Sequence, residues 1–201
     1  MKHLIIYAHP SENSFSNRLN QALVLESERR GWDVVTRDLY ALNFDPVLGA
    51  DDLAQLKSGS TPLAIQTEQK FITEADVISF VYPLWWAGFP AIMKGYIDRI
   101  LAHGFAFKAD ANGVDGLLKG KRVYLYTSMG NSLEQYEQKG LLDAFRKIQG
   151  GEIFEFCGME VVSQQFFPQI PSASEDKIQF HLEQALTGFE PLTQGVSVKS
   201  A

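Results

Sequence analysis

The sequence has little of several features that mark particular classes of protein. Cys157 is the only cysteine among 201 residues, so no intrachain disulfide and no cysteine-rich metal site can form. No stretch approaches the roughly 18 uninterrupted apolar residues that read as a membrane-spanning helix. The apolar run from Leu4 to Ala8 is too short for the core of a signal sequence. We therefore expect a soluble protein in a reducing compartment, the cytoplasm.

Charge of one sign is not concentrated anywhere along the chain. The 18 Lys and Arg residues are interspersed with 24 Asp and Glu residues, and the net charge is −6. This distribution argues against a nucleic-acid partner, which favours clusters of basic residues. An apolar fraction of 45% is ordinary for a folded protein. We expect a single domain over residues 1–187, followed by a C-terminal tail, residues 188–201, that has no periodic pattern.

Five short apolar segments are predicted to be strands, and helical patterns separate them. The strand segments are 4–8, 33–36, 77–82, 122–127 and 160–166. Apolar residues three and four apart predict helices near Phe15 and Met93 and a third along Leu141, Leu142, Phe145 and Ile148, and Ser172 with Glu175 predicts a capping box before a last helix. Segment 43–70 is predicted to be an irregular excursion with one or two short helices. Strands that alternate with helices indicate an α/β fold with a doubly wound, five-stranded parallel sheet.

In such a sheet, ligands bind beyond the carboxyl ends of the strands. The first strand leads into His9 and then into Ser14-Phe15-Ser16, which begin a helix. The free amides and the positive dipole of a helix N-terminus attract a phosphate. Ser14 also suits an ordinary helix cap, and a lone histidine at a strand end is often structural, so both interpretations stay open here.

Two later strands end in loops of unusual composition. Residues 82–86, Tyr-Pro-Leu-Trp-Trp, offer an apolar wall for a planar ring, although both tryptophans also suit a core or an interface. If the strand pattern continues, its alternation places Trp86 at the ring and Trp85 on the opposite face. Residues 127–130, Thr-Ser-Met-Gly, offer hydroxyls and a glycine that lets the backbone approach a ligand, although an ordinary turn is the alternative. Together the three strand ends predict one ligand with a phosphate and a flat heterocycle. A flavin fits that description.

Three stretches resemble the NAD(P)H:quinone oxidoreductases of the DT-diaphorase type. They are Ile6-Tyr7-Ala8-His9-Pro10 with Ser14-Phe15, then Asp38 to Pro46, and then Tyr82 to Gly95, which contains a Pro-Leu-x-Trp-x-Gly-x-Pro pattern. The likeness extends from about His3 to Leu186. It implies a flavodoxin-like fold with strand order 2-1-3-4-5, a bound flavin that is either FAD or FMN, and NADH or NADPH as co-substrate. It also implies a small quinone-like acceptor and a homodimer.

The resemblance assigns roles to individual residues. The flavin phosphate corresponds to the loop of His9, Ser14, Phe15 and Ser16, and the adenosine part of FAD to positions near Asp98 and Lys177. The flavin ring corresponds to positions lined by Pro83, Leu84, Trp86, Thr127, Ser128, Met129, Gly130 and Tyr136. Of these, the residues expected nearest to the chemistry are Trp86, Thr127, Met129, Gly130 and Tyr136. No metal is implied.

Two departures from the family pattern lie in the expected substrate pocket, at Phe107 and Leu142, and a third lies in the stretch expected to contact the flavin ring, at Met129. Phe107 stands in Phe105-Ala106-Phe107 where the family has a tyrosine, so a hydroxyl is missing. Leu142 stands where the family has a histidine near the flavin pyrimidine edge, and Met129 replaces a common glycine. A pocket with fewer polar groups discriminates less between acceptors, so we expect a broad acceptor range.

The activity expected from these features is two-electron transfer from NAD(P)H, through the flavin, to a quinone or a similar flat acceptor. Three alternatives stay open. A flavodoxin-type electron carrier would share the fold, but this chain lacks the Thr-rich phosphate loop of such carriers. A regulatory subunit of a membrane transporter is a stronger rival, since related bacterial flavoproteins are ancillary subunits of potassium-efflux systems. A protein without a cofactor would make the strand-end motifs turns and core.

Overall fold

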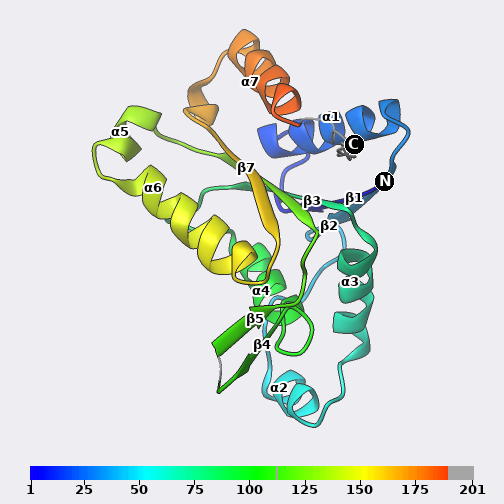
Figure 1. Cartoon of the computed structure of the whole chain (residues 1–201). Coiled ribbons are helices and arrows are strands. Elements are labelled where there is room, and N and C mark those ends of the chain that lie inside the picture. The colour runs from blue at the N-terminus through cyan, green and yellow to red at the C-terminus, as the bar shows by residue number, and fades with distance from the viewer. Residues whose placement is uncertain (112, 190–201) are drawn as a thin grey trace, which may run out of the picture.

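A parallel sheet of five strands forms the centre of the computed structural model, which describes residues 1–111 and 113–189 (Figure 1). The strands lie in the order β2-β1-β3-β6-β7, and each neighbouring pair is parallel. This is the predicted 2-1-3-4-5 order, because β4 and β5 form a separate hairpin. All five predicted strands are present. The bounds are β1 Lys2–Tyr7, β2 Asp33–Asp38, β3 Val77–Pro83, β4 Phe107–Asp110, β5 Gly113–Gly116, β6 Arg122–Ser128 and β7 Glu160–Phe167.

Helices cover both faces of the sheet (Figure 1). On one face lie α1 (Phe15–Arg29) and α7 (Glu175–Thr187), and on the other lie α3 (Leu63–Glu74) and α4 (Ala91–Ile100). The remaining helical segments are α2 (Ala50–Lys57), α5 (Leu133–Glu137), α6 (Leu141–Phe145), a π-helix (Arg146–Glu155) and a 3-10 turn (Ile170–Ser172). Helices α2 and α3 both begin within the predicted excursion. None of the helices described is long and apolar enough to cross a membrane.

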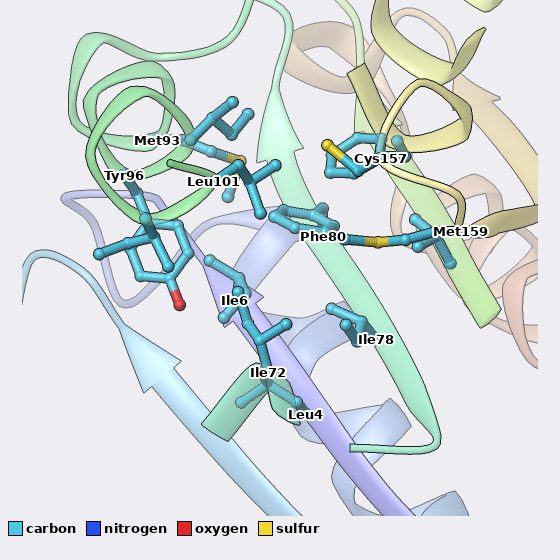
Figure 2. Close-up of a cluster of buried hydrophobic side chains, with 14 of the residues drawn as sticks. Leu4, Ile6, Ile72, Ile78, Phe80, Met93, Tyr96, Leu101, Cys157 and Met159 are labelled. Atoms are coloured by element: carbon cyan, nitrogen blue, oxygen red, sulfur yellow. The ribbon is translucent and has the colours of Figure 1, made fainter. Parts of the chain in front are cut away.

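The core has two parts because alternate residues of a strand point to opposite faces. In β1, Leu4 and Ile6 face the layer of α3 and α4, whereas Ile5 and Tyr7 face the layer of α1 and α7. Figure 2 shows the first of these clusters, in which Phe80 of β3 lies among side chains from both neighbouring helices and from the segment that precedes β7. Strands buried on both faces explain why the apolar runs in the sequence are nearly continuous.

Helix α1 follows its predicted pattern and leads from the edge of the sheet back to β2. Phe15, Leu19 and Leu23 are buried, as the predicted apolar stripe requires. The helix ends at Arg29, and Gly31 has a φ of +70°, a left-handed conformation that glycine adopts without a steric penalty. Because Phe15 is buried with the rest of the apolar stripe, it fixes the first residue of the helix near the carboxyl end of β1.

Two details of the sequence prediction are corrected. Ser174, and not Ser172, caps the last helix, since its hydroxyl accepts a hydrogen bond of 3.3 Å from the amide of Lys177. Ile148, predicted to continue the apolar stripe of the third helix, is 58% exposed, because the chain changes to a π-helix after α6 and rotates its side chains. Phe189, two residues beyond the expected boundary at 187, is completely buried. Residues 190–201, the rest of the predicted tail, lie outside the described part of the chain.

Candidate functional site

Three loops that follow β1, β3 and β6 meet at the carboxyl edge of the sheet. The strands are in register there: Tyr7 pairs with Val81, and Pro83 pairs with Ser128. The amide of Leu84 donates a 2.8 Å hydrogen bond to the carbonyl of Ser128, which joins the second loop to the third. The structure therefore brings together the three strand ends that the sequence singled out.

The first loop presents the N-terminus of α1. Ser14 caps this helix, and its hydroxyl accepts a 3.1 Å hydrogen bond from the amide of Asn17. Within the described residues, the amides of Phe15 and Ser16 donate to no acceptor. The two interpretations of this segment are thus compatible, since Ser14 caps the helix and still leaves two amides for an anion.

A cavity of about 320 Å³ lies against this helix end. The hydroxyls of Ser16 and Ser128 are 3.4 Å apart, so the cavity wall joins the first and third loops. The opposite wall comes from the 3-10 turn and the start of α7. The lining residues are His9, Ser11, Asn13, Ser14, Phe15, Ser16, Arg18, Ser128, Ile170, Pro171, Ala173 and Ile178.

His9 is held as a neutral hydrogen-bond donor at this cavity. Its Nδ1 accepts a 3.0 Å hydrogen bond from the amide of Ser11, which assigns the proton of the neutral ring to Nε2. Burial lowers the pKa of His9, so the ring is uncharged near neutral pH. The ring of Trp85 lies 6.0 Å from that of His9, centroid to centroid. The first and second loops therefore contact each other through side chains.

The second loop is a tight turn that presents Trp86 to solvent. Trp85 and Gly88 exchange two backbone hydrogen bonds of 3.1 and 3.0 Å, and the residues between them, Trp86 and Ala87, have φ values of 49° and 60°. Positive φ at both central positions defines a type I′ turn, which is strained for residues other than glycine. Strand β3 ends at Pro83, so strand alternation does not separate the two tryptophans. Trp86 is fully exposed and Trp85 is 40% exposed, and neither is a core residue of the chain.

The third loop offers the backbone of Gly130 and the hydroxyl of Ser128 to a ligand. Thr127 is completely buried, so its hydroxyl does not face the open edge, whereas Ser128, which is 9% exposed, lines the cavity beside Ser16. The amides of Met129 and Ile170 are bonded to the carbonyls of Phe167 and Met129. In contrast, Gly130 is exposed, and its amide has no acceptor within the described residues. Gly130 therefore supplies the free donor at this edge.

A small apolar cluster packs against the third loop and supports it. Met129, Leu142 and Phe145 are buried in it, and Leu84 and Tyr136 pack against them. The ring of Tyr136 lies 5.9 Å from that of Phe145. Leu142 is thus part of the packing that holds the loop, and its side chain is 4% exposed.

Three predicted residues lie elsewhere in the protomer. Asp98 pairs with Lys94 at 2.6 Å on α4, and Phe107 lies beside His103 at the start of β4. Both line a separate groove of about 360 Å³ next to α2. Lys177 lies on α7, over the opposite face of the sheet, with its ammonium 4.8 Å from the ring of Phe180. One protomer therefore does not bring Asp98 and Lys177 to one ligand.

Arg18 is a site residue that the sequence reasoning missed. It lines the cavity, and it follows Ser14 by four residues, a spacing that places both on one side of a helix. The spacing between Ser14 and Arg18 is therefore a sequence signal that could have identified Arg18 as a residue near the expected phosphate site. Its partner Glu175 is 157 positions away, and no local pattern connects the two.

Comparisons with known proteins agree with this architecture. The family described by a flavodoxin-like fold matches residues 1–188. A Haemophilus influenzae protein named as an uncharacterized NAD(P)H oxidoreductase is 41% identical over 171 residues, 85% of each chain. Human ribosyldihydronicotinamide dehydrogenase (quinone) is 35% identical over 199 residues, which cover 88% of this chain and 86% of the human protein.

Solved structures show the same likeness. The NAD(P)H:quinone oxidoreductase from Methanothermobacter marburgensis superposes with a TM-score of 0.85 at 25% identity, over 94% of this chain and 97% of that one. An FMN-dependent NADH-azoreductase from Bacillus anthracis, solved in complex with FMN, shares the fold with a TM-score of 0.70 at 20% identity, over 94% and 97% of the two chains. The resemblance noted in the sequence is thereby confirmed. The chain belongs to the flavodoxin-like family that includes the NAD(P)H:quinone oxidoreductases, and it is an oxidoreductase.

Proposed function

We propose that this protein is a flavin-dependent reductase that transfers two electrons from NADH or NADPH to quinones and similar flat aromatic acceptors. The observation that carries the proposal is the meeting of three features at one sheet edge. They are the free amides of Phe15 and Ser16, the free amide of Gly130 and the exposed ring of Trp86. A phosphate, a polar ring edge and an apolar ring face are the three parts of a flavin that such groups recognise.

The residues of the first loop fit the phosphate end. The two free amides and the Ser16 hydroxyl would bind phosphate oxygens, and His9 would donate its Nε2 proton to the same group. The cavity of about 320 Å³ provides room for this end of the molecule. When bound, the flavin would supply the redox chemistry, namely two-electron transfer between a nicotinamide and the acceptor.

The residues of the other two loops fit the ring. The amide of Gly130 would support negative charge at the polar edge, where a fixed donor needs no reorganisation. Pro83, Leu84 and Tyr136 would line the ring, and Trp86 would cover one face and exclude water from it. The turn holds Trp86 outward in a strained backbone conformation. Backbone strain of this kind is common at ligand-binding sites, which supports a binding role for Trp86. Ser128, whose hydroxyl lies 3.4 Å from that of Ser16 at the cavity, would contribute to the phosphate end, and Thr127 and Met129, whose side chains are buried, would hold the loop in place.

We further propose a homodimer in which a second copy completes the substrate pocket. Phe107 and Asp98 line an apolar groove with Leu53, which is 43% exposed, and exposed apolar patches of this kind mark interfaces. An isologous pair would bring these residues of one copy toward the open loops of the other. Phe107 offers no hydrogen bond to an acceptor carbonyl, and Leu142 is buried in the cluster that supports the third loop, so the pocket would contain few polar groups and would accept quinones, azo and nitro aromatics.

A transporter-subunit role has no support in the features or comparisons described above, because the relatives reported are named as oxidoreductases. The test of the proposed function is direct. The purified protein is expected to show flavin absorbance, to release FMN or FAD on denaturation, and to consume NADH or NADPH when a simple naphthoquinone is added. A protein that binds neither flavin and consumes neither nucleotide refutes the proposal. Light scattering that shows a fully active monomer refutes the dimer.

A further inference from the structure

The cavity at the N-terminus of α1 contains one strong cation, Arg18. Among the residues that line it, His9 is neutral near pH 7 because burial lowers its pKa, and the others carry no charge. Arg18 lies four residues after the cap residue Ser14, at the end of the first turn. The phosphate end proposed above therefore has a single side chain that can offer a full positive charge.

Helix stability does not explain a cation at this position. The positive end of the helix dipole disfavours Lys and Arg in the first turn and favours Asp and Glu there. The first turn of α1 contains no acidic residue. In contrast, the first turn of α7 carries Glu175 and Asp176, and its cap is Ser174, as the dipole predicts. The reversed arrangement in α1 is what a bound anion would compensate.

Arg18 is held by a carboxylate at the edge of this cavity. Its Nη1 donates to Oε2 of Glu175 at 2.9 Å and its Nη2 to Oε1 at 2.5 Å, a bidentate pair between α1 and α7. Figure 1 shows these two helices side by side above the sheet. The hydrogen bonds and charge of Arg18 lower the pKa of Glu175, so this carboxylate stays ionised. The cavity thus has a positive charge in its lining and a negative charge just outside it.

Resting on the proposed function, we infer that Arg18 is the phosphate-recognising cation of the flavin site and that Glu175 competes with the phosphate for it. Carboxylate and phosphate both match the planar fork of a guanidinium, so the two anions are alternative partners of the same group. The side chain of Glu175 is 73% exposed and that of Arg18 is 35% exposed. An ion pair so accessible to water adds little stability. Replacing the Glu175 carboxylate by a phosphate as the partner of Arg18 therefore costs little free energy.

The pair thereby determines how strongly the site prefers phosphorylated flavins to riboflavin, which has the same ring and no phosphate. Arg18 favours FMN and FAD, and Glu175 reduces that preference. A residue that merely supports the fold would affect all three flavins alike. The ratio of affinities for FMN and riboflavin is therefore the quantity that tests the inference.

The first measurement is equilibrium dialysis of the full-length protein against FMN, FAD or riboflavin. Arg18→Gln is expected to weaken FMN and FAD binding about tenfold, because a charge-assisted hydrogen bond is lost, and to change riboflavin binding less than about twofold. Arg29→Gln removes the same charge from the exposed C-terminal end of the same helix and is expected to change none of the three. Arg18→Lys keeps the charge without the fork and should give an intermediate loss, which separates recognition from failure to fold.

The second measurement concerns Glu175. Glu175→Gln is expected to tighten FMN and FAD binding about threefold to fivefold, and this gain should shrink when salt is raised from about 0.05 to about 0.5 M. In the Arg18→Gln background the substitution should have no effect, since the competition needs both partners. Glu183→Gln, on the exposed side of the same helix, is the matched control.

The outcomes separate this inference from the proposed function. If the wild type binds none of the three flavins, the proposed function fails. If it binds them and Arg18→Gln weakens riboflavin as much as FMN, or leaves the ratio unchanged, the role of Arg18 is overturned. If Glu175→Gln weakens FMN binding or does not alter it, Glu175 is not a competitor.

Discussion

Acid should destabilise this protein partly through one buried imidazole, that of His3. The side chain is 1% exposed and bridges α1 and β3. The hydroxyl of Ser27 donates to the carbonyl of Leu23 at 2.7 Å, so its oxygen accepts from Nδ1 of His3, also at 2.7 Å. Nε2 then accepts a hydrogen bond of 2.8 Å from the hydroxyl of Ser79. Both nitrogens of the neutral ring are satisfied, and the site is built for that form.

Burial, with a smaller contribution from the charge of Arg30, lowers the pKa of His3 from 6.5 to about 3. Below pH 6.5 the unfolded chain therefore takes up a proton that the folded chain refuses, and the stabilisation is lost as the pH falls from about 6.5 toward about 3. A shift of one pKa unit corresponds to about 1.4 kcal/mol, so His3 should remove about 2 kcal/mol of unfolding free energy between pH 8 and pH 5.

Urea denaturation at pH 8, 7, 6 and 5, followed by far-UV circular dichroism, measures this loss. His3→Asn should be less stable at pH 8, since packing and one hydrogen bond are lost, but its stability should fall by about 2 kcal/mol less than that of the wild type on going to pH 5. His103→Asn, at an exposed position, should retain the full loss. If His3→Asn keeps the wild-type slope, the imidazole is not the group responsible.

Two further changes test the fold and the site. Gly95→Ala places a methyl group on the backbone of Pro46 and should cost about 3 kcal/mol in urea denaturation, whereas Gly49→Ala, at an open helix cap where glycine is preferred to alanine, should cost about 0.5 to 1 kcal/mol; equal costs would contradict the packing. Trp86→Ala should weaken flavin binding about tenfold in dialysis, because an aromatic wall is lost, and Trp85→Ala less than about threefold; equal losses would contradict the assignment of Trp86 to the ring.

The sheet and its carboxyl edge were predictable because both follow from local patterns. Continuous apolar runs identify strands that are buried on both faces, and Val77 to Pro83 is buried at every position. The right-handed rule for parallel crossovers then limits the strand order. The position of the loops follows from topology alone, which is why the sequence predicts that His9, Leu84 and Gly130 lie close together.

The hairpin and the π-helix were not predictable, because neither leaves a local pattern in the sequence. Strands β4 and β5 expose most of their residues and show no apolar alternation. Their position depends on Gly116, whose Cα packs against the backbone of Cys157 and Gly158, far away in the sequence. The π-helix interrupts the apolar stripe after Phe145, and a 3.6-residue pattern cannot anticipate a wider turn.

Side-chain direction at the site was the least predictable property. A strand pattern extended to Trp85 and Trp86 assumes that the strand continues, but Pro83 ends it and a turn with two positive φ values follows. Thr127 occupies the expected position, yet its hydroxyl is buried, and the donor that remains open is the amide of Gly130. Backbone donors leave no residue-specific trace in a sequence, so motif reasoning assigned their role to the nearest hydroxyls.

The charge at the cavity beside the N-terminus of α1 could not be predicted from local sequence patterns, because it depends on contacts made only in the folded chain. Ser14 and Arg18 are neighbours on α1 and visible as a local spacing, but the net charge of the cavity mouth depends on Glu175, 157 positions later. That residue is oriented by its own helix, since an acidic first turn stabilises α7 whatever it faces. Under the competition proposed above, the same carboxylate would serve the helix and, through Arg18, reduce the attraction of the cavity for anions. A substitution of Glu175 chosen for its effect on helix stability would then also change ligand affinity, so the two properties would be coupled.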